Sequence, residues 1–245
     1  MIPFFESPGY QEATARLDYA LERRDPVALL SGPRGSGKTT LLEHWSRKLR
    51  RAGLLVALLR TPGTFEHDFL WELCVQLKAE AGIGSTPTQL WFHLREQLAA
   101  YRLEERPVAI LVDHAEEMAP ETADVLLTLA RLHSGDSGHA SLVLAIDHQH
   151  LSRLDPRLYH LAALKIELEP WNVADTSRYV DAYRQANPDS LQTVSDETVQ
   201  TLAECADGNP QLISRILDLS RMAVAQEETG SISPQEVRAL REELL

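Results

Sequence analysis

The sequence predicts an α/β fold in which a parallel sheet carries helices on both faces, followed by a smaller part made only of helices. Short apolar runs alternate with longer helix-type segments through the first two thirds of the 245 residues. These strand signals stop after Pro170. A glycine-rich turn also joins the first apolar run directly to a helix-type segment. Alternation of strand and helix is typical of parallel sheets, because each helix returns the chain to the same edge.

Five segments are predicted as strands because they are short and nearly continuously apolar, as strands covered on both faces are. They are 27–31, 54–60, 108–113, 141–147 and 164–168. Between them, helices are predicted at about 37–52, 65–82, 87–103 and 120–134, with a short element near 148–160. Together these elements are expected to form a core domain over residues 1–168.

Residues 169–245 are predicted to form a small helical domain, with helices at about 173–186, 195–206, 210–226 and 234–244. Two of these helices start with a capping side chain followed by a proline, Asn209-Pro210 and Ser233-Pro234. The charge also changes at this boundary. Residues 169–245 hold 6 basic and 14 acidic residues, whereas residues 1–168 hold 18 and 22.

The composition argues against several classes of protein. A net charge of −12 disfavours a nucleic-acid partner, whose phosphates are bound by Lys and Arg. The two cysteines, Cys74 and Cys205, form no CxxC pair and are expected to be reduced thiols. No leader-like segment is recognised, and the longest apolar run, Leu54–Leu59, is far too short to span a membrane. We therefore expect a cytoplasmic protein without membrane insertion.

The most informative segment matches the phosphate-loop motif GxxxxGK[ST]. It reads Gly32-Pro33-Arg34-Gly35-Ser36-Gly37-Lys38-Thr39. Its glycines let backbone N–H groups point at a phosphate, and the helix that begins there adds a positive dipole end. Lys38 is expected to bridge the β- and γ-phosphates, and the Thr39 hydroxyl to bind Mg²⁺. ATP and Mg²⁺ are thus the predicted ligands, with Thr40 among the nucleotide-binding residues.

An acidic residue at the end of an apolar strand is the expected second half of such a site. Asp113 ends the run 108–113 and is predicted to act on the Mg²⁺ ion through water. Arg34 occupies a variable position of the loop, where it is either solvated or in contact with a γ-phosphate or a neighbouring subunit.

Two further segments resemble ExeA/GspA-like ATPases, which belong to the AAA+ class and are associated with general secretion. They are Phe4-Phe5-Glu6-Ser7-Pro8-Gly9-Tyr10-Gln11-Glu12-Ala13 and Asp207-Gly208-Asn209-Pro210-Gln211-Leu212-Ile213. The resemblance implies a P-loop NTPase core of the AAA+/ASCE type followed by a helical lid, with ATP bound between them. It also implies that Tyr10 lines an adenine pocket; alternatively, the N-terminal segment is a strap that buries Phe4 and Phe5.

The chain departs from the family pattern where a Glu usually follows the metal-binding Asp, because His114 occupies that position. An imidazole can accept a proton, but it offers one accepting nitrogen instead of two carboxylate oxygens. Glu116 and Glu117 follow within one turn. We expect weak hydrolysis, with Glu116 or His114 activating the water and Lys38 stabilising charge; efficient hydrolysis and binding without turnover stay open.

Three other positions also depart from the family. Gln211 replaces the arginine that follows the lid proline, and Arg215 one turn later is a substitute or a solvated side chain. Asp147 occupies the polar sensor position at the end of the fourth strand. Arg157 is the best candidate for an arginine finger, the alternative being a surface arginine.

The sequence therefore predicts an ATP-binding AAA+-type ATPase that uses its nucleotide state to control assembly or a protein partner. One alternative is a nucleotide-gated scaffold that does not hydrolyse ATP. The other is a helper ATPase associated with DNA, which the acidic lid disfavours.

Overall fold

The computed structural model of this chain describes residues 4–61, 65–132, 140–187, 194–227 and 231–244, without the side chains of 223–227. These residues form two compact units. The α/β unit comprises Glu12–Gly32 and Lys38–Leu168, and the helical unit comprises Met1–Gln11, Pro33–Gly37 and Glu169–Leu245. The chain passes into the helical unit after Leu168, and two segments from earlier in the sequence also belong to that unit.

A five-stranded, fully parallel sheet forms the centre of the α/β unit, in the order β2-β3-β4-β1-β5. The strands are β1 (Val27–Gly32), β2 (Leu55–Arg60), β3 (Val108–Asp113), β4 (Ala140–Asp147) and β5 (Ala162–Glu167). Every residue of β3 and β4 is buried, as their apolar runs predict, whereas the edge strand β5 alternates between exposed and covered positions. The predicted fold class is confirmed.

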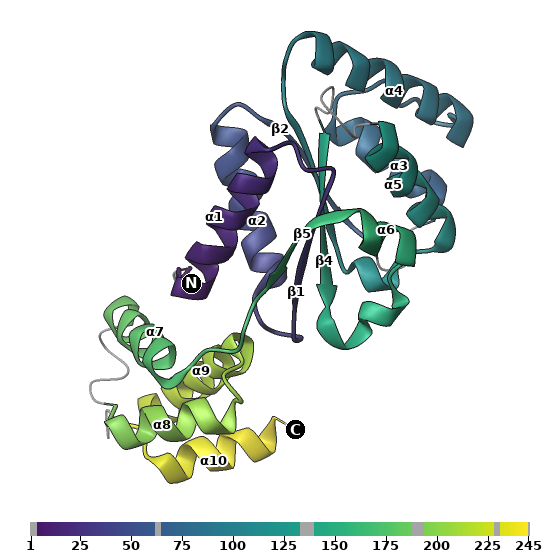
Figure 1. Cartoon of the computed structure of the whole chain (residues 1–245). Coiled ribbons are helices and arrows are strands. Elements are labelled where there is room, and N and C mark those ends of the chain that lie inside the picture. Colours follow the sequence, from purple (N-terminus) through teal and green to yellow (C-terminus); the bar gives the residue numbers. More distant parts are fainter. Residues whose placement is uncertain (1–3, 62–64, 133–139, 188–193, 228–230, 245) are drawn as a thin grey trace. The chain divides into compact units, whose positions relative to one another are not determined.

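Helices cover both faces of this sheet (Figure 1). On one face lie α1 (Pro8–Glu22) and α2 (Lys38–Arg51). On the other face lie α3 (Glu66–Gln76), α4 (Pro87–Leu103), α5 (Pro120–Leu132) and α6 (Pro156–Leu161). The core between the sheet and this second layer is built from fully buried apolar side chains, among them Leu59, Phe69, Leu94, Ile110 and Leu126.

Three helical elements of the α/β part differ from the sequence-based expectation. The helix α1 was not predicted, although Ser7 and Pro8 repeat the cap-then-proline signal and the Ser7 hydroxyl accepts from the Tyr10 N–H. The helix α3 ends at Gln76 and not near residue 82, because Lys78 adopts a left-handed conformation (φ 57°) without a glycine to mark it. The segment near 148–160 splits into a 3₁₀ helix, His148–Arg153, and α6.

The helical unit contains α7 (Val173–Ala186), α8 (Asp196–Cys205), α9 (Pro210–Glu227) and α10 (Pro234–Glu243). Ser233 caps α10 in a reciprocal capping box with Glu236, as the sequence indicates. The unit has an apolar core of its own, built from side chains that include Tyr179, Val199, Leu202, Ile213 and Ile216. Gly208 (φ 65°) precedes α9, and its carbonyl accepts a hydrogen bond of 2.7 Å from the Trp171 N–H.

None of the helices in the described part of the chain has the length and apolar character that a membrane span requires.

Candidate nucleotide-binding site

Three central strands of the α/β unit end in residues that the sequence analysis singled out. β1 ends at Gly32, β3 at Asp113 and β4 at Asp147, and Gly32 pairs with Asp147 in the register of the sheet. Because the strands are parallel, their carboxyl ends meet at one edge, where ligands of open α/β sheets bind. Asp113 and Asp147 are both buried.

The two predicted metal ligands are in direct contact. The Thr39 hydroxyl, in the first turn of α2, donates a hydrogen bond of 2.7 Å to Oδ2 of Asp113. The other carboxylate oxygen of Asp113 accepts from the His114 N–H at 3.1 Å. The Asp113 carboxylate is therefore held in one orientation, with its Oδ2 and the Thr39 hydroxyl side by side.

Lys38 stands at the start of α2 and is half-buried. Its ammonium group donates to the Gly32 carbonyl at 2.8 Å. Burial lowers the pKa of Lys38, and the negative charges of Asp147, Glu116 and Asp113 oppose this shift. One ammonium group thus faces three carboxylates at this edge of the sheet.

The chain turns sharply after Asp113, and this turn brings Glu116 into the same group. His114 adopts a left-handed conformation (φ 58°, ψ 43°) that opens the 3₁₀ turn Ala115–Glu117. The Thr61 hydroxyl, which follows β2, donates to the carbonyls of Asp113 and His114 and so holds the turn. The Glu116 side chain is only 7% exposed and accepts a hydrogen bond of 3.3 Å from the Asp147 N–H.

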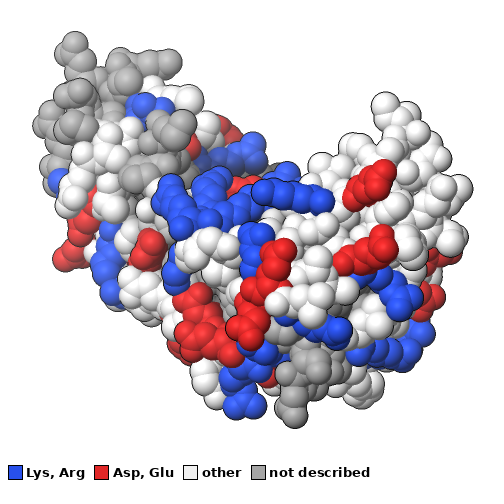
Figure 2. All heavy atoms as spheres, turned by 90° about the horizontal axis from the view of Figure 1, so that it is seen from above, with Lys and Arg blue, Asp and Glu red and all other residues white. Residues whose placement is uncertain are grey.

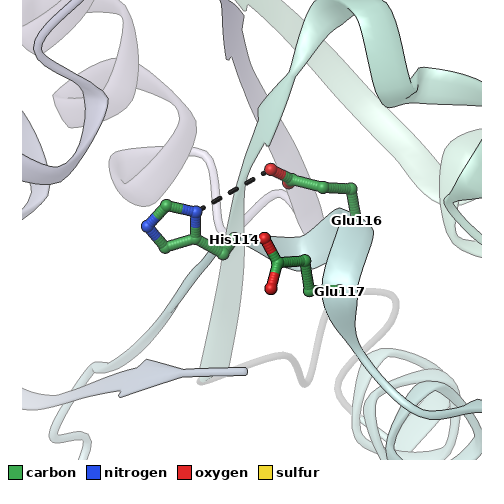
Figure 3. A group of neighbouring side chains, drawn as sticks. All are labelled: His114, Glu116 and Glu117. Carbon is green, nitrogen blue, oxygen red and sulfur yellow. Dashed lines mark ion pairs between the residues drawn. The ribbon is translucent and has the colours of Figure 1, made fainter. Parts of the chain in front are cut away.

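The His114 side chain lies near the carboxylates of Asp113 and Glu116, and Figure 3 shows its contact with Glu116. Its Nε2 is 3.7 Å from Asp113 Oδ2, and its Nδ1 is 3.8 Å from Glu116 Oε1. His114 is 43% exposed, so it is much less enclosed than either carboxylate. Of these two side chains, Glu116 is therefore the enclosed one, and it is the one that lies beside Lys38.

The loop segment Pro33–Gly37 belongs to the helical unit. Gly35 (φ 80°) and Gly37 (φ 96°) have positive φ angles, which explains why the motif requires glycine at these positions. The Ser36 hydroxyl is buried and has no hydrogen-bond partner among the described residues.

The predicted lid motif contacts this loop segment within the helical unit. The Asn209 side chain donates to the Arg34 carbonyl at 2.8 Å, and a Cβ atom on Gly35 would lie 2.5 Å from Asn209 Oδ1. The Gln211 N–H lies 3.3 Å from the Gly35 carbonyl, while its side chain is exposed. The sequence analysis identified Asn209 as a helix cap and as part of the lid motif, but it did not predict the contact of Asn209 with the loop.

Tyr10 and Arg157, two further residues singled out from the sequence, each contact neighbouring side chains. The Tyr10 ring packs edge-on against Phe4, with ring centroids 4.7 Å apart, and Phe5 packs against Trp171 in the helical unit. Arg157 donates to Asp155 and to Asp124, each at 2.7 Å, and these hydrogen bonds raise its pKa. The arginine-finger role of Arg157 stays a prediction.

The sequence of residues 21–154 matches the AAA domain family. The chain belongs to this family. The AAA domain is that of nucleotide-binding ATPases, so the predicted class is confirmed, and the predicted resemblance to secretion-type ATPases is confirmed by a relative. This relative is General secretion pathway protein A of Aeromonas hydrophila, 26% identical over 224 residues. The match covers 89% of this chain but only 41% of that protein.

Solved structures share the fold of this AAA domain at low sequence identity. Cdc6p from Pyrobaculum aerophilum has a TM-score of 0.76 at 21% identity, covering 100% of this chain and 69% of that one. The Aeropyrum pernix ORC1 protein, solved in complex with DNA, has a TM-score of 0.72 at 17% identity, with coverages of 99% and 67%. The Thermotoga maritima RuvB Holliday junction branch migration motor reaches 0.63 at 16% identity, with coverages of 97% and 68%.

Proposed function

We propose that this AAA domain binds ATP with Mg²⁺ and hydrolyses it weakly, and that its nucleotide state controls assembly or a protein partner. The observation that carries the proposal is the hydrogen bond between Thr39 and Asp113. It joins the hydroxyl and the carboxylate that an ATP-bound Mg²⁺ ion needs, from two elements far apart in the sequence.

The charges of the site fit a divalent cation. Lys38 faces Asp113, Glu116 and Asp147, so the group carries two more negative than positive charges. A Mg²⁺ ion balances this excess, and it prefers the oxygen ligands that Thr39 and Asp113 offer. When bound, Mg²⁺ supplies positive charge beside the phosphates of the nucleotide. The buried hydroxyl of Ser36, in the phosphate loop, is a free donor for a phosphate oxygen.

Among the candidate bases, Glu116 has the better position for ATP hydrolysis. A carboxylate near the γ-phosphate accepts a proton from the attacking water and orients it. Glu116 is enclosed and lies close enough to Lys38 to affect its pKa, whereas the His114 side chain is 43% exposed. Glu116 is also engaged by the Asp147 N–H and lies beside His114, which reduces its freedom to accept a proton and supports weak turnover.

The first experiment compares ATP binding and phosphate release by the whole chain and by Lys38→Ala. The matched control is Lys48→Ala, which removes an exposed lysine near the end of α2 that pairs with Asp18 of α1. We expect Lys38→Ala to lose at least tenfold in ATP affinity and all measurable turnover, while the control keeps both. ATP binding by Lys38→Ala at wild-type strength would reject the proposed site.

The second candidate function is a nucleotide-gated scaffold, which binds ATP but does not hydrolyse it. It is favoured because His114 replaces the usual glutamate after Asp113 and Gln211 replaces the usual arginine of the lid motif. The same assay separates the two. If the wild type binds ATP but releases phosphate no faster than Lys38→Ala, the chain is a nucleotide-gated scaffold and the ATPase proposal fails.

A protein partner is favoured over DNA on charge. On the face shown in Figure 2, basic side chains form a small cluster and otherwise lie next to acidic ones. Several basic side chains are already paired, as in Arg60–Glu43 and Arg106–Glu104, and the C-terminal 77 residues from 169 to 245 contain no lysine. Binding of duplex DNA that depends on ATP at physiological salt would contradict this choice.

A further inference from the structure

A second group of metal-ligand side chains lies next to the nucleotide-binding residues. His114, Glu116 and Glu117 each offer one ligand atom, and these atoms all lie within 4.8 Å of one another. Figure 3 shows the three side chains around one short turn, with the imidazole facing Glu116. Ligand atoms about 2.0–2.2 Å from one zinc ion are about 3.3 Å apart. Small side-chain rotations therefore suffice to place all three around one ion.

The backbone holds these side chains together before any ion binds. The left-handed conformation of His114 reverses the chain immediately after β3. The Glu117 N–H then donates to the His114 carbonyl at 2.9 Å, which closes a 3₁₀ turn. Because 3₁₀ geometry has three residues per turn, His114 and Glu117 stand nearly above one another. The buried Thr61 side chain fixes the start of this turn.

The two ring nitrogens of His114 lie as they do in metal-binding imidazoles. Imidazoles that bind a metal generally direct their other ring N–H at a carboxylate or carbonyl, which fixes the tautomer. His114 Nε2 lies 3.7 Å from the buried Asp113 carboxylate. With Nε2 on the Asp113 side, Nδ1 lies on the Glu116 side, 3.8 Å from Glu116 Oε1, where it can bind a metal ion together with the two glutamates.

The charges of the group also call for a cation. Glu117 is exposed, and within the described ranges no lysine or arginine forms an ion pair with it. Glu117 therefore adds a second negative charge beside Glu116, and this favours a cation at the turn. A set of one imidazole nitrogen and two carboxylate oxygens suits Zn²⁺ and similar transition metals, whereas Mg²⁺ prefers oxygen alone.

We propose that His114, Glu116 and Glu117 form a binding site for Zn²⁺ or a similar transition-metal ion, distinct from the Mg²⁺ ligands Thr39 and Asp113. A metal ion bound at this site would use the Glu116 carboxylate as a ligand. Glu116 could then no longer accept a proton from the attacking water. This inhibitory consequence rests on the proposed ATPase function; the metal site itself does not.

The site is tested on the full chain, stripped of metal by a chelator and kept free of nucleotide. Zn²⁺ is titrated in competition with a coloured chelator, and Co²⁺ is used as a probe because its visible absorption reports protein ligands. We expect one ion per chain. His114→Gln and Glu117→Gln should each weaken Zn²⁺ binding about tenfold or more and remove the Co²⁺ band.

The matched control is Glu121→Gln, the same substitution at an exposed position in the first turn of α5. It should bind Zn²⁺ as the wild type does. Circular dichroism of the metal-free proteins establishes that each variant is folded; Glu117 is exposed, so at least Glu117→Gln should be. Absence of binding at micromolar Zn²⁺, or equal affinity of the wild type and Glu117→Gln, overturns the proposal.

The inhibitory consequence is read from phosphate release at saturating Mg²⁺ and ATP, with Zn²⁺ present or chelated. Zn²⁺ should suppress turnover of the wild type and should have about tenfold less potency on Glu117→Gln. Tight Zn²⁺ binding with unchanged turnover would reject inhibition. A wild type without turnover even when Zn²⁺ is chelated would reject the ATPase proposal, while the binding titration would still decide the metal site.

Discussion

Thr39 and Asp113 are 74 positions apart in the sequence, yet a hydrogen bond of 2.7 Å joins the threonine hydroxyl to the aspartate carboxylate. This bond ties the start of α2 to the end of β3. It also places the two proposed Mg²⁺ ligands next to one another, so that little reorganisation would be needed for an ion to bind.

Thr39→Val removes the hydroxyl and keeps the shape of the side chain. We expect the Mg²⁺ dependence of ATP binding to shift to at least tenfold higher Mg²⁺, because one ligand is lost. Without Mg²⁺, the free energy of unfolding should fall by about 1.5–3 kcal/mol, the value of a hydrogen bond to a charged group. The control is Thr128→Val, an exposed threonine on α5. Chemical denaturation and ATP titrations measure both effects, and equal behaviour of the two variants would contradict this reading.

Glu116→Gln should lower ATP turnover by about a hundredfold or more while leaving ATP bound, because an amide cannot accept the proton of the attacking water. Glu121→Gln, at an exposed site outside the cluster, should keep wild-type turnover. Single-turnover phosphate release measures the chemical step directly. A Glu116→Gln enzyme that is as fast as the wild type would assign the base to another group.

His114→Glu restores a carboxylate directly after Asp113, where the family usually has one. We expect turnover to rise, because the carboxylate offers two accepting oxygens in place of one nitrogen. The left-handed backbone at this position (φ 58°) costs stability for most residues other than glycine and asparagine, so thermal unfolding should be measured in parallel. Unchanged turnover in a folded His114→Glu protein would count against the idea that His114 limits hydrolysis.

Burial of Cys74 makes stability depend on pH in the alkaline range. Burial raises the pKa of this thiol from 9.0 to about 11. Above pH 9 the thiol of the unfolded chain loses its proton, whereas the buried thiol of the folded chain keeps it. The free energy of unfolding therefore falls as the pH rises from 9 to 11. Relative to Cys74→Ala, the wild type should therefore lose about 2–3 kcal/mol between pH 9 and 11. Urea unfolding of both proteins at several pH values checks this, and parallel pH profiles would refute it.

Two glycines of the helical unit should respond to alanine in opposite ways. Gly208 has a φ of 65°, and a Cβ atom there would lie 2.2 Å from the Trp171 carbonyl oxygen, so Gly208→Ala should lower the free energy of unfolding by more than about 1 kcal/mol. Gly9 lies in α1 with no atom within 4 Å of the corresponding position, so Gly9→Ala should stabilise by about 0.5–1 kcal/mol. Thermal unfolding of both variants measures the difference. A stabilised Gly208→Ala would contradict the steric argument.

Much of the α/β fold could be predicted because its signals are local. The runs that form β1, β3 and β4 are nearly continuously apolar, as is typical of strands buried on both faces. The phosphate loop is recognisable because Gly35 and Gly37 adopt backbone conformations that other residues avoid. Helix ends without such a residue, as at Lys78 after α3, were predicted less well.

The tertiary structure decided what no local pattern encodes. The sequence by itself determined the phosphate-loop motif that ends in Lys38 and Thr39, and it predicted Asp113 as their partner because an apolar strand ends there. Only the fold decided that Glu116 lies in the same group as Lys38, because that depends on the left-handed turn at His114 and on a hydroxyl from Thr61, which follows another strand. Such contacts arise from chain packing across the sheet, and their partners are far apart in the sequence.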